Sequence, residues 1–141
     1  MAQEICYKFI KLDLTQFATF EEQYVDDEMP IELSSSFQFS YDFENDVVCC
    51  KTSVILTKAT GPILKAELNS FFVLMEESVN SITSNGIIKL PVELMTQFAS
   101  LGYGTMRGVI YAKTIGTPLE EIVLPPNDIH KIFTSPAEFR R

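Results

Sequence analysis

One short segment restricts the possible folds of this chain more than any other. From residue 37 to residue 43 the sequence reads Phe, Gln, Phe, Ser, Tyr, Asp, Phe, so that aromatic and polar side chains alternate. A period of two places successive side chains on opposite faces of a β-strand, and the pattern predicts a strand with one buried face. The turn-forming residues Glu44–Asp46 then lead into a β-branched run. We therefore expect a hairpin of two antiparallel strands, at 33–43 and 47–58.

Two more strands are expected beside this hairpin. A second turn, at Thr60–Pro62, leads into a third strand at 63–76. The segment 5–14 alternates less regularly and is expected to form a fourth strand at an edge of the sheet, where its two lysines would discourage pairing with other chains. Alternation in the third strand gathers polar side chains on a face that we expect to be open to solvent: Lys65, Glu67 and Asn69.

The end of the third strand is apolar on both faces, because Phe71, Val73 and Met75 occupy the face that is polar a few residues earlier. Such a strand needs cover on both sides. A helix would supply one cover, and a neighbouring subunit is the expected source of the other. The sequence therefore predicts a homo-oligomer, a dimer or a tetramer.

Helices are expected in the second half of the chain. Pro91 is a favourable first residue for a long helix at 91–115, which Gly102 and Gly104 are expected to kink or divide. Small residues at a spacing of four offer a face for close packing, which we assign to the oligomer interface: Gly104, Gly108 and Ala112.

The long helix should end at Gly116–Pro118, a glycine followed closely by a proline. A crossover would then lead to a short helix at 127–134, with Asn127 as its N-cap residue. Strands followed by helices indicate an α+β fold. No linker divides the chain, so we expect one domain spanning residues 1–141.

Charge, hydrophobicity and cysteine content exclude several classes of partner and location for this protein. A net charge of −8 repels phosphate groups, which argues against nucleic acid as a partner and favours a basic one. No segment reads as a secretory signal or a membrane span, so we expect a cytoplasmic protein that does not insert into membranes. Three cysteines, two of them adjacent, make a disulfide framework improbable.

The motifs of catalysis are not found in the sequence. His130 is the one histidine, without a cysteine or second histidine at ligand spacing, so a metal site is not expected. Neither a phosphate-binding loop nor a dinucleotide-binding glycine motif occurs. We therefore expect no cofactor, no catalytic residues and no enzymatic activity.

The order of the elements, four antiparallel strands, a long helix, a crossover and a short helix, resembles that of the SecB family of export chaperones. The similarity continues in the helix stop, where Arg107 and Ile110 precede Gly116–Leu119, and upstream in Lys11–Phe17. The crossover and last helix resemble the corresponding SecB segment at six positions: Leu124, Pro126, Asp128, Ile129, Ile132 and Phe133.

This resemblance implies a holding chaperone or adaptor that binds unfolded or precursor polypeptides without ATP. It implies SecA or an antitoxin as a further partner, with docking carried over to Asp13 and Glu67, although Lys65 stands where the family's docking patch is apolar. The alternative is a small-molecule-binding α+β domain, with or without enzymatic activity. The implied groove for clients would be lined by six residues: Phe39, Tyr41, Ile122, Leu124, Ile129 and Phe133.

Overall fold

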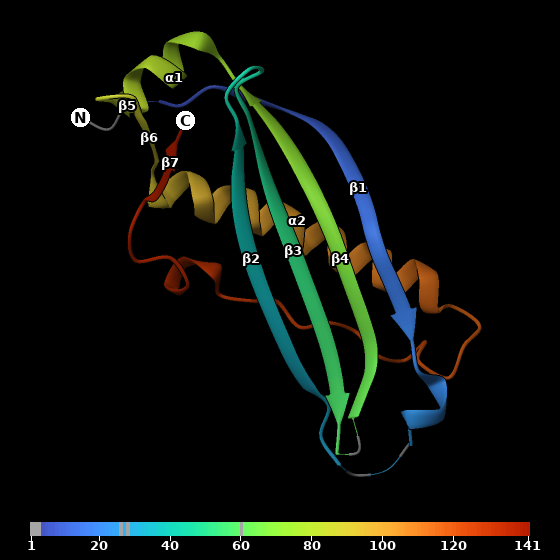
Figure 1. The fold of residues 1–141 in the computed structure, drawn as a ribbon. Coiled ribbons are helices and arrows are strands. Elements are labelled where there is room, and N and C mark those ends of the chain that lie inside the picture. Colours follow the sequence, from blue (N-terminus) through green and yellow to red (C-terminus); the bar gives the residue numbers. More distant parts are fainter. Residues whose placement is uncertain (1–3, 26, 28, 60) are drawn as a thin grey trace.

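The computed structural model describes residues 4–25, 27, 29–59 and 61–141. Its largest element is a four-stranded antiparallel sheet (Figure 1). The strands are β1 (Tyr7–Thr19), β2 (Glu32–Asp42), β3 (Val47–Lys58) and β4 (Gly61–Leu74), in the spatial order β1-β4-β3-β2. All four strands expected from the sequence are therefore present. Thr60 of the expected second turn lies outside the described residues.

Strand β1 is longer than expected and continues to Thr19. Its pairing with β4 shifts register between Phe9 and Lys11 and again between Leu14 and Gln16. Each β-bulge adds a residue and thereby interrupts the alternation that a sequence pattern can reveal. The expectation that this strand ends at residue 14 was wrong for that reason.

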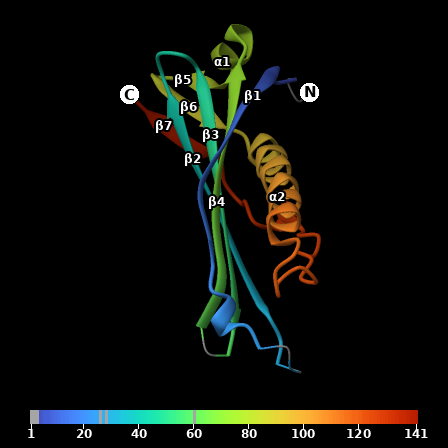
Figure 2. The same ribbon diagram turned by 90° about the vertical axis from the view of Figure 1, so that its right-hand side faces the viewer.

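Helix α2 (Val92–Thr114) covers one face of the sheet and leaves the other face bare, as Figure 2 shows. The rings of Phe72 in β4 and Phe98 in α2 stack with centroids 3.9 Å apart, and both side chains are fully buried. Val48, Val54 and Met106 belong to the same core. Burial of this apolar surface is what holds helix and sheet together.

Gly102 has a different role from the one expected. The helix continues through Gly102 and Gly104, so it is not divided there. The helix approaches the sheet closely at Gly102, because a Cβ atom at this position would come within 2.5 Å of Thr52 Oγ1. The absence of a side chain is therefore needed for packing, a use of glycine that spacing alone does not reveal.

Several small elements were not expected. Helix α1 (Glu76–Ile82) follows β4 directly, with Met75 as its N-cap residue, so the third predicted strand ends two residues early. A second sheet is formed by β5 (Thr83–Ser84), β6 (Ile87–Leu90) and β7 (Ala137–Arg140). The start of β1 and strand β7 both lie toward the end of the molecule that carries α1 (Figures 1 and 2).

The connection after α2 runs back along the sheet on the same side as the helix (Figures 1 and 2). It begins as expected, with Gly116 at a positive φ of 82°. The short helix predicted at 127–134 is reduced to a single 3-10 turn, Ile129–Lys131. Asn127 is not its N-cap residue, and donates instead to Ser35 Oγ at 3.2 Å across to β2.

Candidate functional site

The predicted groove residues come from two segments that lie against each other. Phe39 of β2 packs on Phe133 from the connection after α2, with ring centroids 5.5 Å apart, and Phe37 lies 6.1 Å from the same ring. Tyr41 stacks on Phe139 of β7 at 5.6 Å. The aromatic face of β2 is thus covered by the same chain.

Leu124 and Ile129 lie deeper than expected. Each is only 3% exposed and belongs to the hydrophobic core. In the described chain they form almost no open surface, because the connection after α2 lies against the sheet and turns these side chains inward; Leu124 only borders a hollow near the start of β2. This corrects the expectation that all six residues line an open groove.

An open apolar hollow remains at the end of the sheet where β2 begins. Its volume is about 390 Å³. Two of the six predicted residues, Ile122 and Leu124, contribute to it, together with Val123, which is 67% exposed. The lining comes from the β1–β2 connection, from β2 and β3, and from the crossover: Tyr24, Ile31, Leu33, Leu56 and residues 121–125.

Sequence reasoning identified only part of this lining. Ile31 and Leu33 continue the alternation that runs through Phe37, Phe39 and Tyr41, and the same signal extended upstream would have found them. Tyr24 lies in an irregular connection and has no such signal. Its position depends on contacts with the end of β3, which is distant in sequence.

The part of the connection after α2 that lines the hollow, residues 121–125, is called the crossover, and polar side chains of α2 hold it in place. Tyr103 Oη donates to the carbonyl oxygen of Pro125 at 2.7 Å, and Arg107 Nε donates to that of Leu124 at 3.0 Å. Both bonds use backbone acceptors of the crossover, so they fix its path without engaging its side chains. Val123 is thereby presented to solvent beside the hollow.

The expected docking residues Asp13 and Glu67 lie on the bare face of the sheet. The β1–β4 register places Asp13 opposite Asn69, two residues along β4 from Glu67. Glu67 is half-buried and lies on the same face as Lys65 and Asn69, which confirms the predicted polar face. The register brings the two carboxylates onto neighbouring strands.

The residues expected at an oligomer interface divide between two sides of the molecule. Phe72 stacks on α2, so its neighbours Phe71 and Val73 point to the bare face. Met75 precedes α1. Gly104, Gly108 and Ala112 instead lie exposed on α2, on the other side of the sheet. Three large apolar side chains are exposed beside them: Leu101, Tyr111 and Ile115.

The described part of the chain offers neither a cluster of metal ligands nor an activated cysteine. No group of three or more metal-ligand side chains comes together there. Burial raises the pKa of Cys50 to about 12 and also raises the pKa of Cys49. A raised pKa disfavours the reactive thiolate. Within the described residues, no helix has the length and apolar character needed to span a membrane.

Comparison with known proteins gives a structural match only. No protein-family model matches the sequence, and no curated protein matches it. Among solved structures, the chain is similar to a Mycobacterium tuberculosis SecB-like chaperone in complex with a ChAD peptide from the HigA1 antitoxin. The TM-score is 0.59 with 12% sequence identity, over 86% of this chain and 88% of that one. The α+β architecture expected from the sequence is therefore shared with a SecB-like chaperone.

Proposed function

We propose that this protein is a holding chaperone or adaptor that binds extended apolar segments of unfolded or precursor polypeptides without ATP. The observation that carries the proposal is the open apolar hollow beside β2. Its volume of about 390 Å³ lies within the range of roughly 300–1,000 Å³ typical of ligand pockets. The side chains of the lining are apolar apart from Glu121 and the Tyr24 hydroxyl, so they favour hydrophobic client residues rather than one chemical structure.

The position of β2 supports the same function. It is an edge strand, and in the described part of the chain it pairs with β3 alone. An extended client could hydrogen-bond to the free backbone groups of this edge, which requires no particular client side chain. An apolar client residue would enter the hollow at the same time. Edge and hollow together would hold many sequences in an unfolded state.

Charge favours basic clients. Glu121 lines the hollow, and Glu32 and Glu120 are exposed in the adjoining segments. The whole chain carries a net charge of −8. Complementary charge accelerates encounter and disfavours acidic partners. A segment with apolar anchors flanked by lysine or arginine is therefore the preferred client.

The proposed partners follow from the same fold. An antitoxin segment is one candidate, because the similar chaperone was solved with an antitoxin peptide. Delivery to SecA is a second candidate, through Asp13 and Glu67 on the bare face, with Lys65 weakening the acidic character of that face. Either partner would be met in the cytoplasm, which is the proposed location.

The alternative, a small-molecule-binding domain, has one observation in its favour. A cleft of about 790 Å³ lies between the start of β1, α1 and the start of α2, and mixes apolar with polar lining. Tyr7, Glu93 and Gln97 are among its polar residues. Exclusive binding of small molecules at this cleft would favour the alternative.

An aggregation assay with a refolding client protein distinguishes the chaperone from the small-molecule-binding domain. We expect the purified protein to suppress light scattering by a refolding client when no ATP is present, because the hollow and the edge need no energy source. A small-molecule-binding domain would leave the scattering unchanged at several-fold molar excess. That result would remove the chaperone proposal.

We further propose that the protein is a homo-oligomer and that the exposed face of α2 forms the interface. A Cβ atom at Gly104 or Gly108 would meet no other atom within 4 Å, and the apolar Tyr111 and Ile115 beside them are 58% and 57% exposed. Replacing Gly108 by leucine is expected to separate the subunits by forcing the helices apart. Light scattering of wild type and variant measures the mass, and a 15.9 kDa wild-type particle at high concentration would contradict the proposal.

A further inference from the structure

A buried lysine stands at the end of β3, next to the hollow. The side chain of Lys58 is only 6% exposed. It follows Leu56, which lies on the same face of β3 and lines the hollow. A buried ammonium group is stable only when its hydrogen-bond donors have acceptors. The partners of Lys58 therefore show what this lysine holds.

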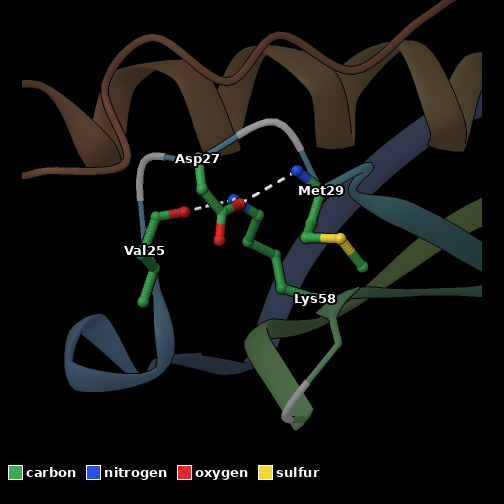
Figure 3. A network of polar contacts seen from close by, with 4 residues as sticks. All are labelled: Val25, Asp27, Met29 and Lys58. Carbon is green, nitrogen blue, oxygen red and sulfur yellow. Dashed lines mark hydrogen bonds and ion pairs between the residues drawn. The ribbon is translucent and has the colours of Figure 1, made fainter.

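The partners of Lys58 lie in the connection between β1 and β2. Lys58 Nζ donates to Asp27 Oδ1 at 2.8 Å and to the carbonyl oxygen of Val25, as Figure 3 shows. The same ammonium group lies 5.1 Å from the ring centre of Tyr24. Asp27 Oδ1 also accepts a hydrogen bond from the backbone N–H of Met29 at 3.0 Å. One side chain of β3 thus fastens the connection at three positions.

The fastened connection supplies one wall of the hollow. Tyr24 and Ile31 line the hollow from this side, and Leu56 forms part of its floor. Neither Lys58 nor Asp27 is part of the lining. The ion pair therefore joins wall and floor from outside the hollow.

We infer that Lys58 and Asp27 are positioning residues, which set the shape of the hollow by holding Tyr24 against the end of β3. The inference rests on the proposed function, because the affinity for a client is what the wall would control. The two charges differ in burial, since the Asp27 side chain is 44% exposed and that of Lys58 only 6%. Asp27 is thus the partner that solvent and solutes reach.

This asymmetry predicts how each partner responds to replacement. Without the Asp27 charge, the buried ammonium group of Lys58 has only neutral acceptors. Water must then reach this group, and water can enter only if the β1–β2 connection, with Tyr24, moves away from β3. Methionine in place of Lys58 removes the buried charge altogether. A buried ion pair replaced by an apolar side chain is often neutral for stability, so this variant separates positioning from folding.

The experiment measures client affinity and the mobility of the connection in the same variants. Affinity is read by fluorescence anisotropy with a labelled peptide rich in leucine, valine and lysine, and mobility by hydrogen exchange over residues 21–31. We expect Lys58→Met and Asp27→Asn to speed hydrogen exchange in this segment. Both variants should also bind the peptide about tenfold more weakly, because the mobile connection must become ordered each time a peptide binds. Asp27→Glu, which keeps the carboxylate, should restore most of the affinity.

A matched control separates this effect from general instability. Val48 lies in the core at the opposite end of β3, so Val48→Ala lowers stability without touching the connection. It should leave client affinity unchanged. Unchanged affinity in Lys58→Met despite faster exchange would overturn the inference, and so would unchanged exchange. A wild type that binds no peptide would instead contradict the proposed function, while exchange would still show whether the pair holds the connection.

Discussion

Replacing Gly102 by leucine is expected to lower the free energy of unfolding by about 3 kcal/mol, because overfilling a packed core forces helix and sheet apart. Even a single Cβ atom at this position would meet Thr52 Oγ1 at 2.5 Å and Ser70 Oγ at 3.5 Å. Both of these strand residues are fully buried. The smaller change Gly102→Ala should cost less and keep the measurement possible if the leucine variant does not fold.

Gly104 is the matched control, two residues further along the same helix. No atom lies within 4 Å of the place that a Cβ atom would take there, and the position is exposed. Gly104→Leu should therefore gain up to about 0.8 kcal/mol from helix propensity. Guanidinium denaturation measures the free energy of unfolding of both variants. Low protein concentration is used because an oligomer then contributes least to the stability. Equal effects at the two positions would show that α2 does not cross the sheet at Gly102.

Replacing Leu124 by alanine is expected to cost about 2–5 kcal/mol, the usual range for a buried leucine. The side chain is 3% exposed and lies in the core, although it belongs to a connection without regular structure. Its neighbour Val123 is 67% exposed, so Val123→Ala should change stability by no more than about 0.5 kcal/mol. Thermal or chemical unfolding of the two variants gives the comparison.

The outcome at Leu124 also decides how the crossover behaves in solution. If Leu124→Ala costs no more than Val123→Ala, the crossover does not stay docked on the sheet. The groove would then be open along β2, as the sequence predicted. A large difference between the neighbours would confirm that the crossover stays docked and that the groove is not open along β2.

The sheet was predictable because apolar and polar residues alternate along a strand that has one buried face. The stripe through Phe37, Phe39 and Tyr41 and the turn after Phe43 identified the hairpin directly. Strand β1 was predicted only in part, because its bulges shift the alternation. Strand β7 escaped prediction because four residues carry too short a pattern, and its partner β6 lies far away in sequence.

The candidate site was predictable only in its composition. Apolar residues at 122, 124 and 129 indicated contact with the sheet, but periodicity does not say which side chains form the floor and which face a client. The role of Lys58 could not be read at all, since its partners lie 31 and 33 residues away. Gly102 carried a visible signal, a glycine within a helix, whose cause became clear only from the opposing Thr52.

The most direct test of the account is the binding of an extended apolar peptide by a variant altered only at the hollow. Val123→Ser removes an exposed apolar side chain from the lining, and Ile10→Ser removes a comparably exposed one, at 52%, from β1. Fluorescence anisotropy with the labelled peptide, without ATP, gives the affinity of each. The account predicts weaker binding by Val123→Ser and wild-type affinity for Ile10→Ser. Equal affinities in both variants and the wild type, or no binding by the wild type, would contradict it.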